Sequence, residues 1–340
     1  MREMLRRFFR SIGHERVSPE APPGVRKQAP VAVISFNRPH YLSQVLESLA
    51  AQTALNGRHV VLFQDNAVSP YSCKRYGRDE DIAACIDIFR GRFPEGTVAL
   101  AEHNLGIARN FLRAEEFVFN ELEAEACYFF EDDMILSPHY LTMMDQIASF
   151  ALTNDKVGYF TAHGRLGLSL ERQRAMARRM TRMGLHWAFG LTRQHWLDLR
   201  RWLEPYYGFL EGTDYNAKPT RKIGSHYRSM GIPVLAMNQD VMKKAGSYAL
   251  GHVSISTFAC FGKYIGAQGV HHSAEYYDKT PYKHTVLYPE PVELIFPSAD
   301  ELATLRKTEM DIRWRRFRSR FAEAPAPELA ESPTANVNAG

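Results

Sequence analysis

The stretch Ala126-Cys127-Tyr128-Phe129-Phe130-Glu131-Asp132-Asp133 decides the fold. Its first five residues form an apolar, aromatic run that is typical of a fully buried strand. The three carboxylates that follow would repel one another unless a positive charge lay among them. Carboxylate oxygens are also the ligands that Mg²⁺ and Mn²⁺ prefer. The stretch therefore predicts a buried strand that ends in a cation site. The alternative is an acidic turn before a helix, with Ser137 as N-cap and Pro138 as first residue.

Apolar runs on both sides of this strand alternate with helical patterns. The expected strands are 31–36, 59–63, 97–101 and 157–161, and the expected helices are 41–52, 79–92, 106–122, 138–152 and 191–202. Such alternation predicts an α/β fold with a mostly parallel central sheet and helices on both faces. Ligands bind these sheets beyond the carboxyl ends of the strands, where Asn37, Arg38, Asp65 and the acidic triplet (Glu131-Asp132-Asp133) would meet.

Length and composition set the domain organisation. The 340 residues are 45% hydrophobic, which is enough for a large core. We expect a basic N-terminal helix and linker at 1–29, the main domain at 30–300, and a C-terminal helix with a disordered tail at 301–340. A net charge of +4 argues against a dedicated nucleic-acid binder. The cysteines form no Cys-x-x-Cys pair, which argues against structural zinc.

Five short stretches share their order with one enzyme family. They are Val33-Ile34-Ser35-Phe36-Asn37-Arg38, Phe63-Gln64-Asp65, Gly106-Ile107-Ala108-Arg109-Asn110, Phe130-Glu131-Asp132-Asp133-Met134-Ile135-Leu136-Ser137-Pro138, and Phe261-Gly262 with Gly269-Val270-His271-His272. Together they resemble the N-acetylglucosaminyltransferase I-like glycosyltransferases. The resemblance implies the GT-A fold and an inverting, metal-dependent transfer of a hexose or N-acetylhexosamine from a nucleotide sugar, with a UDP-sugar as the expected donor and a glycan or glycoconjugate hydroxyl as acceptor.

The resemblance also implies roles for single residues. Asp133 would be the direct protein ligand of Mn²⁺ (or Mg²⁺). Glu131 and Asp132 would face the sugar nucleotide, and Arg38 would contact its diphosphate or base. Asp65 would accept a hydrogen bond from uracil, although it could equally be a turn residue before Asn66.

Further donor contacts are implied for Asn37, Arg109, Asn110 and His272. Asn110 stands where the family has histidine, which puts its phosphate contact in doubt. His163-Gly164-Arg165 stands where the family has Trp-Asn-Asp-Asn, so the donor need not be an N-acetylhexosamine. Trp187 is either a stacking platform for a sugar or a core tryptophan.

The resemblance places the catalytic base in an Asp-Asp-Trp-Met stretch. Asp214-Tyr215-Asn216 can be laid on that stretch, with Glu211 as the runner-up and a helix cap as the alternative role of Asp214. Two other functions stay open. One is a catalytically inactive nucleotide-sugar-binding scaffold. The other is a sugar nucleotidyltransferase, although Asn37-Arg38-Pro39-His40 holds none of the glycines that such enzymes carry there.

Residues 1–12 mix arginines with apolar residues at helical spacing. This pattern predicts either an interfacial helix on an anionic membrane or a helix docked on its own domain. The sequence has neither eighteen consecutive apolar residues nor the long apolar core of a signal peptide. We therefore expect a cytoplasmic enzyme, either soluble or peripheral on the inner face of the membrane, that acts in the biosynthesis of surface polysaccharide or lipopolysaccharide.

Overall fold

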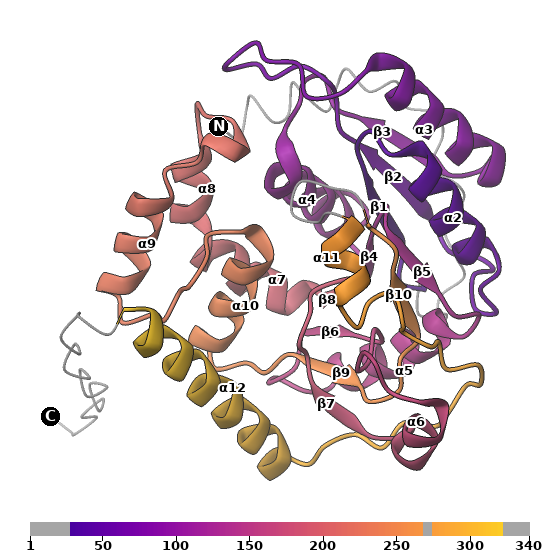
Figure 1. Cartoon of the computed structure of the whole chain (residues 1–340), viewed down its shortest axis with the longest axis vertical. Coiled ribbons are helices and arrows are strands. Elements are labelled where there is room, and N and C mark those ends of the chain that lie inside the picture. Colours follow the sequence, from indigo (N-terminus) through magenta and orange to yellow (C-terminus); the bar gives the residue numbers. More distant parts are fainter. Residues whose placement is uncertain (1–27, 268–273, 322–340) are drawn as a thin grey trace, which may run out of the picture.

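The computed structural model describes residues 28–267 and 274–321, which are built around an eight-stranded sheet (Figure 1). The strand order is β3-β2-β1-β4-β8-β6-β9-β7. The predicted α/β class and mostly parallel sheet are confirmed. The predicted N-terminal helix, His271, His272 and the tail after residue 321 lie outside the described residues, and the domain boundaries stay predictions.

The first half of the sheet is parallel. Its strands are β1 (Val31–Ser35), β2 (Val60–Gln64), β3 (Thr97–Leu100) and β4 (Ala126–Glu131). In the central strand β1, Val31 pairs with Val60 on one side and with Tyr128 on the other. Every residue of β1 and β2 is buried, as expected for strands covered on both faces.

Alternate residues of β1 belong to two different cores. Val31 and Val33 pack with α2 (Pro39–Ala50), α3 (Asp79–Arg92) and α5 (Tyr140–Ala151). Ala32 and Ile34 pack with the opposite layer, formed by α4 (Gly106–Glu116) and α7 (Arg193–Trp202). Because alternate side chains of the strand point to opposite faces, the sheet lies between two layers of helices, which makes three layers. A π-helical turn at Phe117–Glu121 follows α4, within the helix predicted at 106–122.

The second half of the sheet is mixed. Its strands are β6 (Tyr159–Thr161), β7 (Met180–Arg182), β8 (Phe189–Thr192) and β9 (Ile255–Thr257). Strand β8 runs antiparallel between β4 and β6. The helix predicted at 191–202 begins only at Arg193, because Leu191 and Thr192 belong to β8. Gly190 lets Phe160 cross this strand: a Cβ there would lie 2.3 Å from the Phe160 ring.

A small antiparallel ribbon follows the acidic triplet. It pairs β5 (Met134–Leu136) with β10 (Gly262–Tyr264). The alternative of a helix capped by Ser137 is therefore wrong: α5 begins at Tyr140, and His139 occupies its N-cap position. The backbone N–H of Ile265 donates to the carbonyl of Asp133 over 2.9 Å, which brings the chain after β10 against the triplet.

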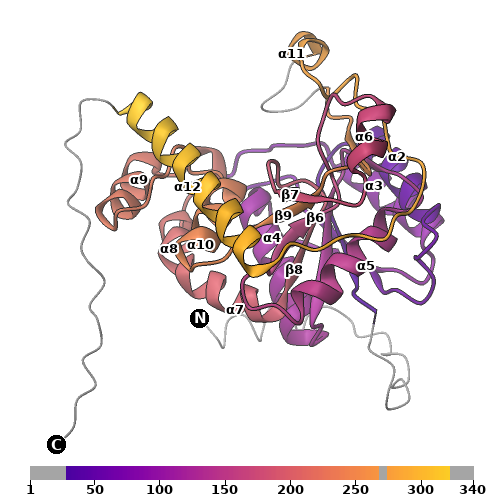
Figure 2. The same ribbon diagram turned by 90° about the horizontal axis from the view of Figure 1, so that it is seen from below.

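The remaining helices flank the sheet. They are α6 (Leu170–Met176), α8 (Glu204–Leu210), the 3-10 turn Tyr215–Ala217, α9 (Thr220–Ser229), α10 (Gln239–Ala249), α11 (Ala274–Lys279) and α12 (Ala299–Arg320). Figure 2 shows α12 running along the side of the molecule that carries α9 and α10. Among the described residues, no helix combines the length and the apolar character that crossing a bilayer requires.

Candidate functional site

The acidic triplet lies at the carboxyl end of β4, beside the end of β1. Because β1 and β4 are parallel neighbours, Ile34 pairs with Glu131 and Arg38 comes to lie against the following turn. The Arg38 guanidinium donates to Asp132 and forms an ion pair with Asp133 over 2.8 Å. Burial alone would lower the pKa of Arg38, but the charges of Asp132 and Asp133 raise it above its usual value. Arg38 thus supplies part of the positive charge that the sequence predicted among the three carboxylates.

Asp133 holds an unused carboxylate oxygen. Its Oδ2 binds Arg38, but its Oδ1 is buried and has no hydrogen-bond partner within the described residues. Burial raises the pKa of Asp133 to about 6; the charge of Asp132 adds to the shift, and Arg38 opposes it. A Cβ at Gly266 would lie 2.9 Å from Oδ2, so only glycine allows the chain this close. A buried oxygen without a partner is costly and indicates a ligand that completes it.

A fourth carboxylate, Asp240 of α10, lies close enough to the triplet for its charge to act on Glu131. Burial raises the pKa of Glu131 well above its usual value, and the charges of Asp133 and Asp240 raise it further. Burial likewise raises the pKa of Asp240. Asp240 lies in the first turn of α10, on a segment more than one hundred residues after the triplet. It was not among the residues predicted from the sequence, although Asp240-Val241-Met242 at a helix start also fits the Asp-Asp-Trp-Met stretch.

Buried ion pairs fix α10, and with it Asp240. Lys243 forms an ion pair with Glu115 of α4, and both side chains are almost fully buried. Lys244 forms an ion pair with Glu309 of α12 over 3.1 Å. At the start of the helix, the Gln239 N–H donates to the Tyr215 hydroxyl over 3.2 Å. Asp240 is therefore carried by a helix that is anchored on two sides.

Asp214, the predicted base, lies in different surroundings. Its carboxylate accepts hydrogen bonds from the hydroxyls of Ser69, Ser72 and Tyr76. These bonds lower its pKa, led by the one from Ser69. Asp214 precedes the turn Tyr215–Ala217 without a side-chain capping bond, so the alternative cap role is wrong. The runner-up Glu211 is exposed. The contacts of Asp214 anchor a loop, which weighs against the base role.

Asp65 and Asn110 are buried, and their side chains form hydrogen bonds with other groups of the protein. Asp65 accepts from the backbone N–H groups of Asn66, Leu105 and Gly106 and from the Asn104 amide. These four donors use the acceptor capacity of its carboxylate, which leaves no room for a uracil N–H. Asn110 donates to the Phe63 carbonyl and accepts from Arg113, at 1% exposure. The predicted nucleotide contacts of both residues are therefore not available in this structure.

The other predicted donor residues lie at the rim. Arg109 donates to the Tyr71 hydroxyl and to the Leu210 carbonyl, and so joins the loop that carries Tyr71 to the end of α8. Asn37 is half-buried at the end of β1. Trp187 is half-buried and stacks on Tyr264, with ring centroids 4.2 Å apart. The Asp133 charge raises the pKa of Tyr264 beyond the effect of burial, which places this aromatic pair near the triplet.

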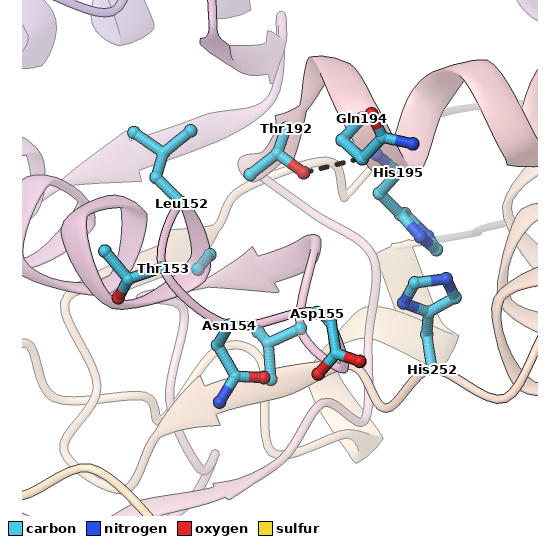
Figure 3. A pocket seen from close by; sticks show the side chains of 10 residues that line it. Leu152, Thr153, Asn154, Asp155, Thr192, Gln194, His195 and His252 are labelled. Atoms are coloured by element: carbon cyan, nitrogen blue, oxygen red, sulfur yellow. Dashed lines mark hydrogen bonds between the residues drawn. The ribbon is translucent and has the colours of Figure 1, made fainter.

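A cavity of about 340 Å³ lies elsewhere, at the opposite edge of the sheet (Figure 3). It is lined by Asp155 in the segment before β6, Thr192 at the end of β8, His195 of α7 and His252 after α10. The His195 imidazole lies 2.8 Å from the Ser247 hydroxyl through Nε2. The cavity shares no lining residue with the acidic triplet.

Comparisons with known proteins give only distant similarities. No family model and no curated protein matches the sequence. One similar solved structure is the mannosyltransferase PcManGT from Pyrobaculum calidifontis in complex with GDP-Man and Mn²⁺, with 13% identity over 75% of this chain and 63% of that one and a TM-score of 0.41. TarS from S. aureus has 16% identity over 51% of this chain and 29% of that one, with a TM-score of 0.36. Glucosyl-3-phosphoglycerate synthase from Mycobacterium tuberculosis, in complex with Mn²⁺, UDP and glucosyl-3-phosphoglycerate, has 9% identity over 53% of this chain and 65% of that one, with a TM-score of 0.32. This chain thus spans less than two thirds of each. TM-scores below 0.5 say nothing about what it binds.

Proposed function

We propose that this protein is a GT-A-type, metal-dependent inverting glycosyltransferase that moves a sugar from a nucleotide sugar to an acceptor hydroxyl. The observation that carries the proposal is the buried, unpartnered Oδ1 of Asp133 beside Arg38, at the carboxyl ends of parallel strands. A carboxylate oxygen can bind a divalent cation, and a neighbouring guanidinium can bind phosphate, so the two together suit a metal-bound diphosphate. A UDP-sugar is our proposed donor, on the resemblance of the motifs.

The residues present fit a divalent cation. Within residues 28–267 and 274–321, no three His, Cys, Asp or Glu side chains form a complete metal site. Mg²⁺ and Mn²⁺ sites that serve phosphates often use one or two carboxylates, with phosphate oxygens and waters as the other ligands. Asp133 would supply that carboxylate. When bound, the ion neutralises charge on the departing diphosphate.

The chain's own side chains supply the rest of the mechanism. Arg38 pairs with the diphosphate, and the Trp187–Tyr264 stack offers an aromatic face to a sugar. Asp240 takes the proton from the acceptor hydroxyl as that oxygen attacks the anomeric carbon, and the bond to the diphosphate breaks in the same displacement. One displacement inverts the configuration. The raised pKa of Asp240 makes it a stronger base than Asp214.

The first experiment measures the binding of UDP, GDP, CMP and dTDP by calorimetry, with and without Mn²⁺. Wild-type protein should bind UDP tightly only with the metal, and Asp133→Asn should lose the metal-dependent part. Asp79→Asn is the matched control, since Asp79 is exposed and, among the described residues, forms an ion pair with exposed Arg75 alone. Binding that survives EDTA would contradict the metal role, and binding without any turnover of a UDP-sugar would favour the inactive scaffold.

A further inference from the structure

Five basic side chains gather where the C-terminal ends of α9 and α12 meet. We call them the basic end surface; they are Arg228, Arg315, Arg316, Arg318 and Arg320. Both figures show the C-terminal end of α12 next to α9 (Figures 1 and 2). The Arg228 guanidinium lies 5.3 Å from the centroid of the Phe321 ring, which joins the two ends directly. No acidic group of residues 28–267 or 274–321 forms an ion pair with any of the five; the ion pairs of α12 involve other residues, such as Arg313 with Glu309.

An aromatic stripe runs through this surface. Trp314, Phe317 and Phe321 are spaced three and four residues apart, so they lie on one face of the last turns of α12. Their rings touch in sequence, with centroids 5.7 Å and 4.8 Å apart. Each side chain is half-buried, and Met230 at the end of α9 is 53% exposed. Arginines thus flank a continuous strip of apolar side chains.

We propose that the basic end surface docks on a bilayer that carries anionic lipid head groups. Unpaired arginines around an aromatic strip are the combination that holds an amphipathic helix at the interface of such a membrane. The guanidinium groups would contact the phosphates of the head groups, and the rings and Met230 would enter the boundary with the acyl chains. Exposed Met230 favours lipid over nucleic acid, because its side chain adds apolar surface that suits acyl chains and offers no ring on which a base could stack. The proposal does not depend on the reaction that the acidic triplet performs.

The test is co-sedimentation of the full chain with vesicles of phosphatidylcholine alone or with added phosphatidylserine. The test variant replaces Arg315, Arg316, Arg318 and Arg320 by glutamine. The matched control replaces four exposed arginines elsewhere, Arg90, Arg92, Arg172 and Arg174, and so changes the net charge equally. Because each arginine near an anionic surface contributes roughly a fivefold factor in partition, the test variant should bind at least tenfold more weakly. The control should bind like wild type, and Met230→Ser should weaken binding by a smaller factor.

Three results would overturn the proposal. Equal losses in the test and control variants would show that only net charge matters. Full binding by the test variant would assign the membrane contact to another segment, such as residues 1–12. Wild-type binding to single-stranded RNA, with no binding to the anionic vesicles, would make the surface a nucleic-acid site. Circular dichroism of each variant checks that α12 keeps its helix.

Discussion

At the scale of single residues, Asp214 and Asp240 show how surroundings decide the chemistry of a carboxylate. Three hydroxyls donate to Asp214, and they stabilise its charged form. Asp240 is held among buried groups near Glu131, where burial favours the protonated form. A general base works best when its pKa approaches the working pH. This difference argues for Asp240.

We predict that Asp240→Asn lowers kcat roughly 10²- to 10⁴-fold, the usual contribution of a general base. The donor should still bind, because Arg38 and Asp133 are unchanged. Asp214→Asn should stay within about tenfold of wild type, since it loses only anchoring contacts of a loop. Steady-state kinetics with a UDP-sugar and an acceptor glycan checks both variants. A full loss in Asp214→Asn with normal turnover in Asp240→Asn would restore the prediction made from the sequence.

The sequence predicted those site residues that lie at the ends of neighbouring parallel strands. The acidic triplet and Arg38 follow apolar runs, and parallel pairing brings such strand ends together. The local hydrogen bonds that occupy Asp65 and Asn110 depend on loops whose conformation no sequence pattern specifies. Asp240 depends on how α10 packs, which two buried ion pairs determine.

The pH dependence of folding tests the environment of Asp65. Burial raises its pKa to about 6 from 3.8, against the opposing effect of its backbone donors. A raised carboxyl pKa means that its contribution to stability is complete below about pH 4 and is lost as the pH rises through about 6. Urea unfolding should therefore show that the stability advantage of wild type over Asp65→Asn shrinks by about 2 kcal/mol between pH 4.5 and 7.5. An advantage that grows with pH would show that the charged form is the stabilising one.

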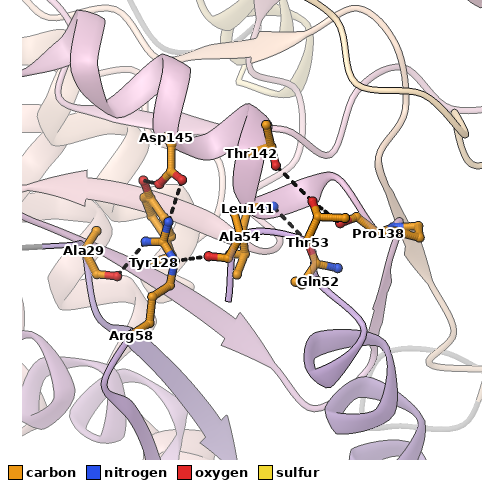
Figure 4. Close-up of polar contacts among 10 residues, drawn as sticks. All are labelled: Ala29, Gln52, Thr53, Ala54, Arg58, Tyr128, Pro138, Leu141, Thr142 and Asp145. Atoms are coloured by element: carbon orange, nitrogen blue, oxygen red, sulfur yellow. Dashed lines mark hydrogen bonds and ion pairs between the residues drawn. The ribbon is translucent and has the colours of Figure 1, made fainter. Parts of the chain in front are cut away.

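At the scale of elements, Arg58 connects the start of the described chain to α5 (Figure 4). Its side chain is 2% exposed and donates to the carbonyls of Ala54 and Ala29 and to Asp145. The Tyr128 hydroxyl of β4 donates to the same carboxylate over 2.7 Å. Arg58 thus fastens a loop, a strand and a helix at one point.

We predict that Arg58→Ala lowers the free energy of unfolding by about 2–3 kcal/mol, because buried acceptors lose their donor and the site loses packing. Arg75→Ala is the matched control: its pair with Asp79 is exposed and should contribute under about 1 kcal/mol. Denaturant unfolding of both variants makes the comparison. Similar small losses would mean that water replaces the Arg58 contacts.

Element prediction succeeded in the parallel half of the sheet and missed most elements of the mixed half, including the helices α9 and α10. The helix 79–92 was placed at its observed bounds, and the strands of the parallel half were placed within one residue at each end. The strands β5, β7, β8, β9 and β10 have three or four residues each, too few to show a period of two. Their partners lie far away in the sequence, so tertiary packing decides them.

At the scale of the whole molecule, α12 fastens the C-terminal part of the described chain to the sheet and to α10. Glu309 of α12 is buried, and its carboxylate faces three cations from three elements. Lys244 comes from α10, Arg182 from β7 and Arg313 from α12 itself. The backbone carbonyl of Tyr248 also accepts from Arg306. The region predicted as a separate C-terminal segment from residue 301 is therefore packed on the main body, and it supports the helix that carries Asp240.

We predict that Glu309→Gln lowers the free energy of unfolding by about 3 kcal/mol, because it leaves buried cations without their counter-charge. Glu293→Gln removes a carboxylate whose pair with Arg178 is exposed, and it should change stability by under about 1 kcal/mol. If α12 also positions α10, kcat of Glu309→Gln should fall at a temperature where the variant is still folded, and Glu293→Gln should keep wild-type kcat. Thermal unfolding and kinetics on the same samples separate the two effects. A destabilised Glu309→Gln with normal kcat would limit α12 to a structural role, because Asp240 would then keep its place without the network that Glu309 completes.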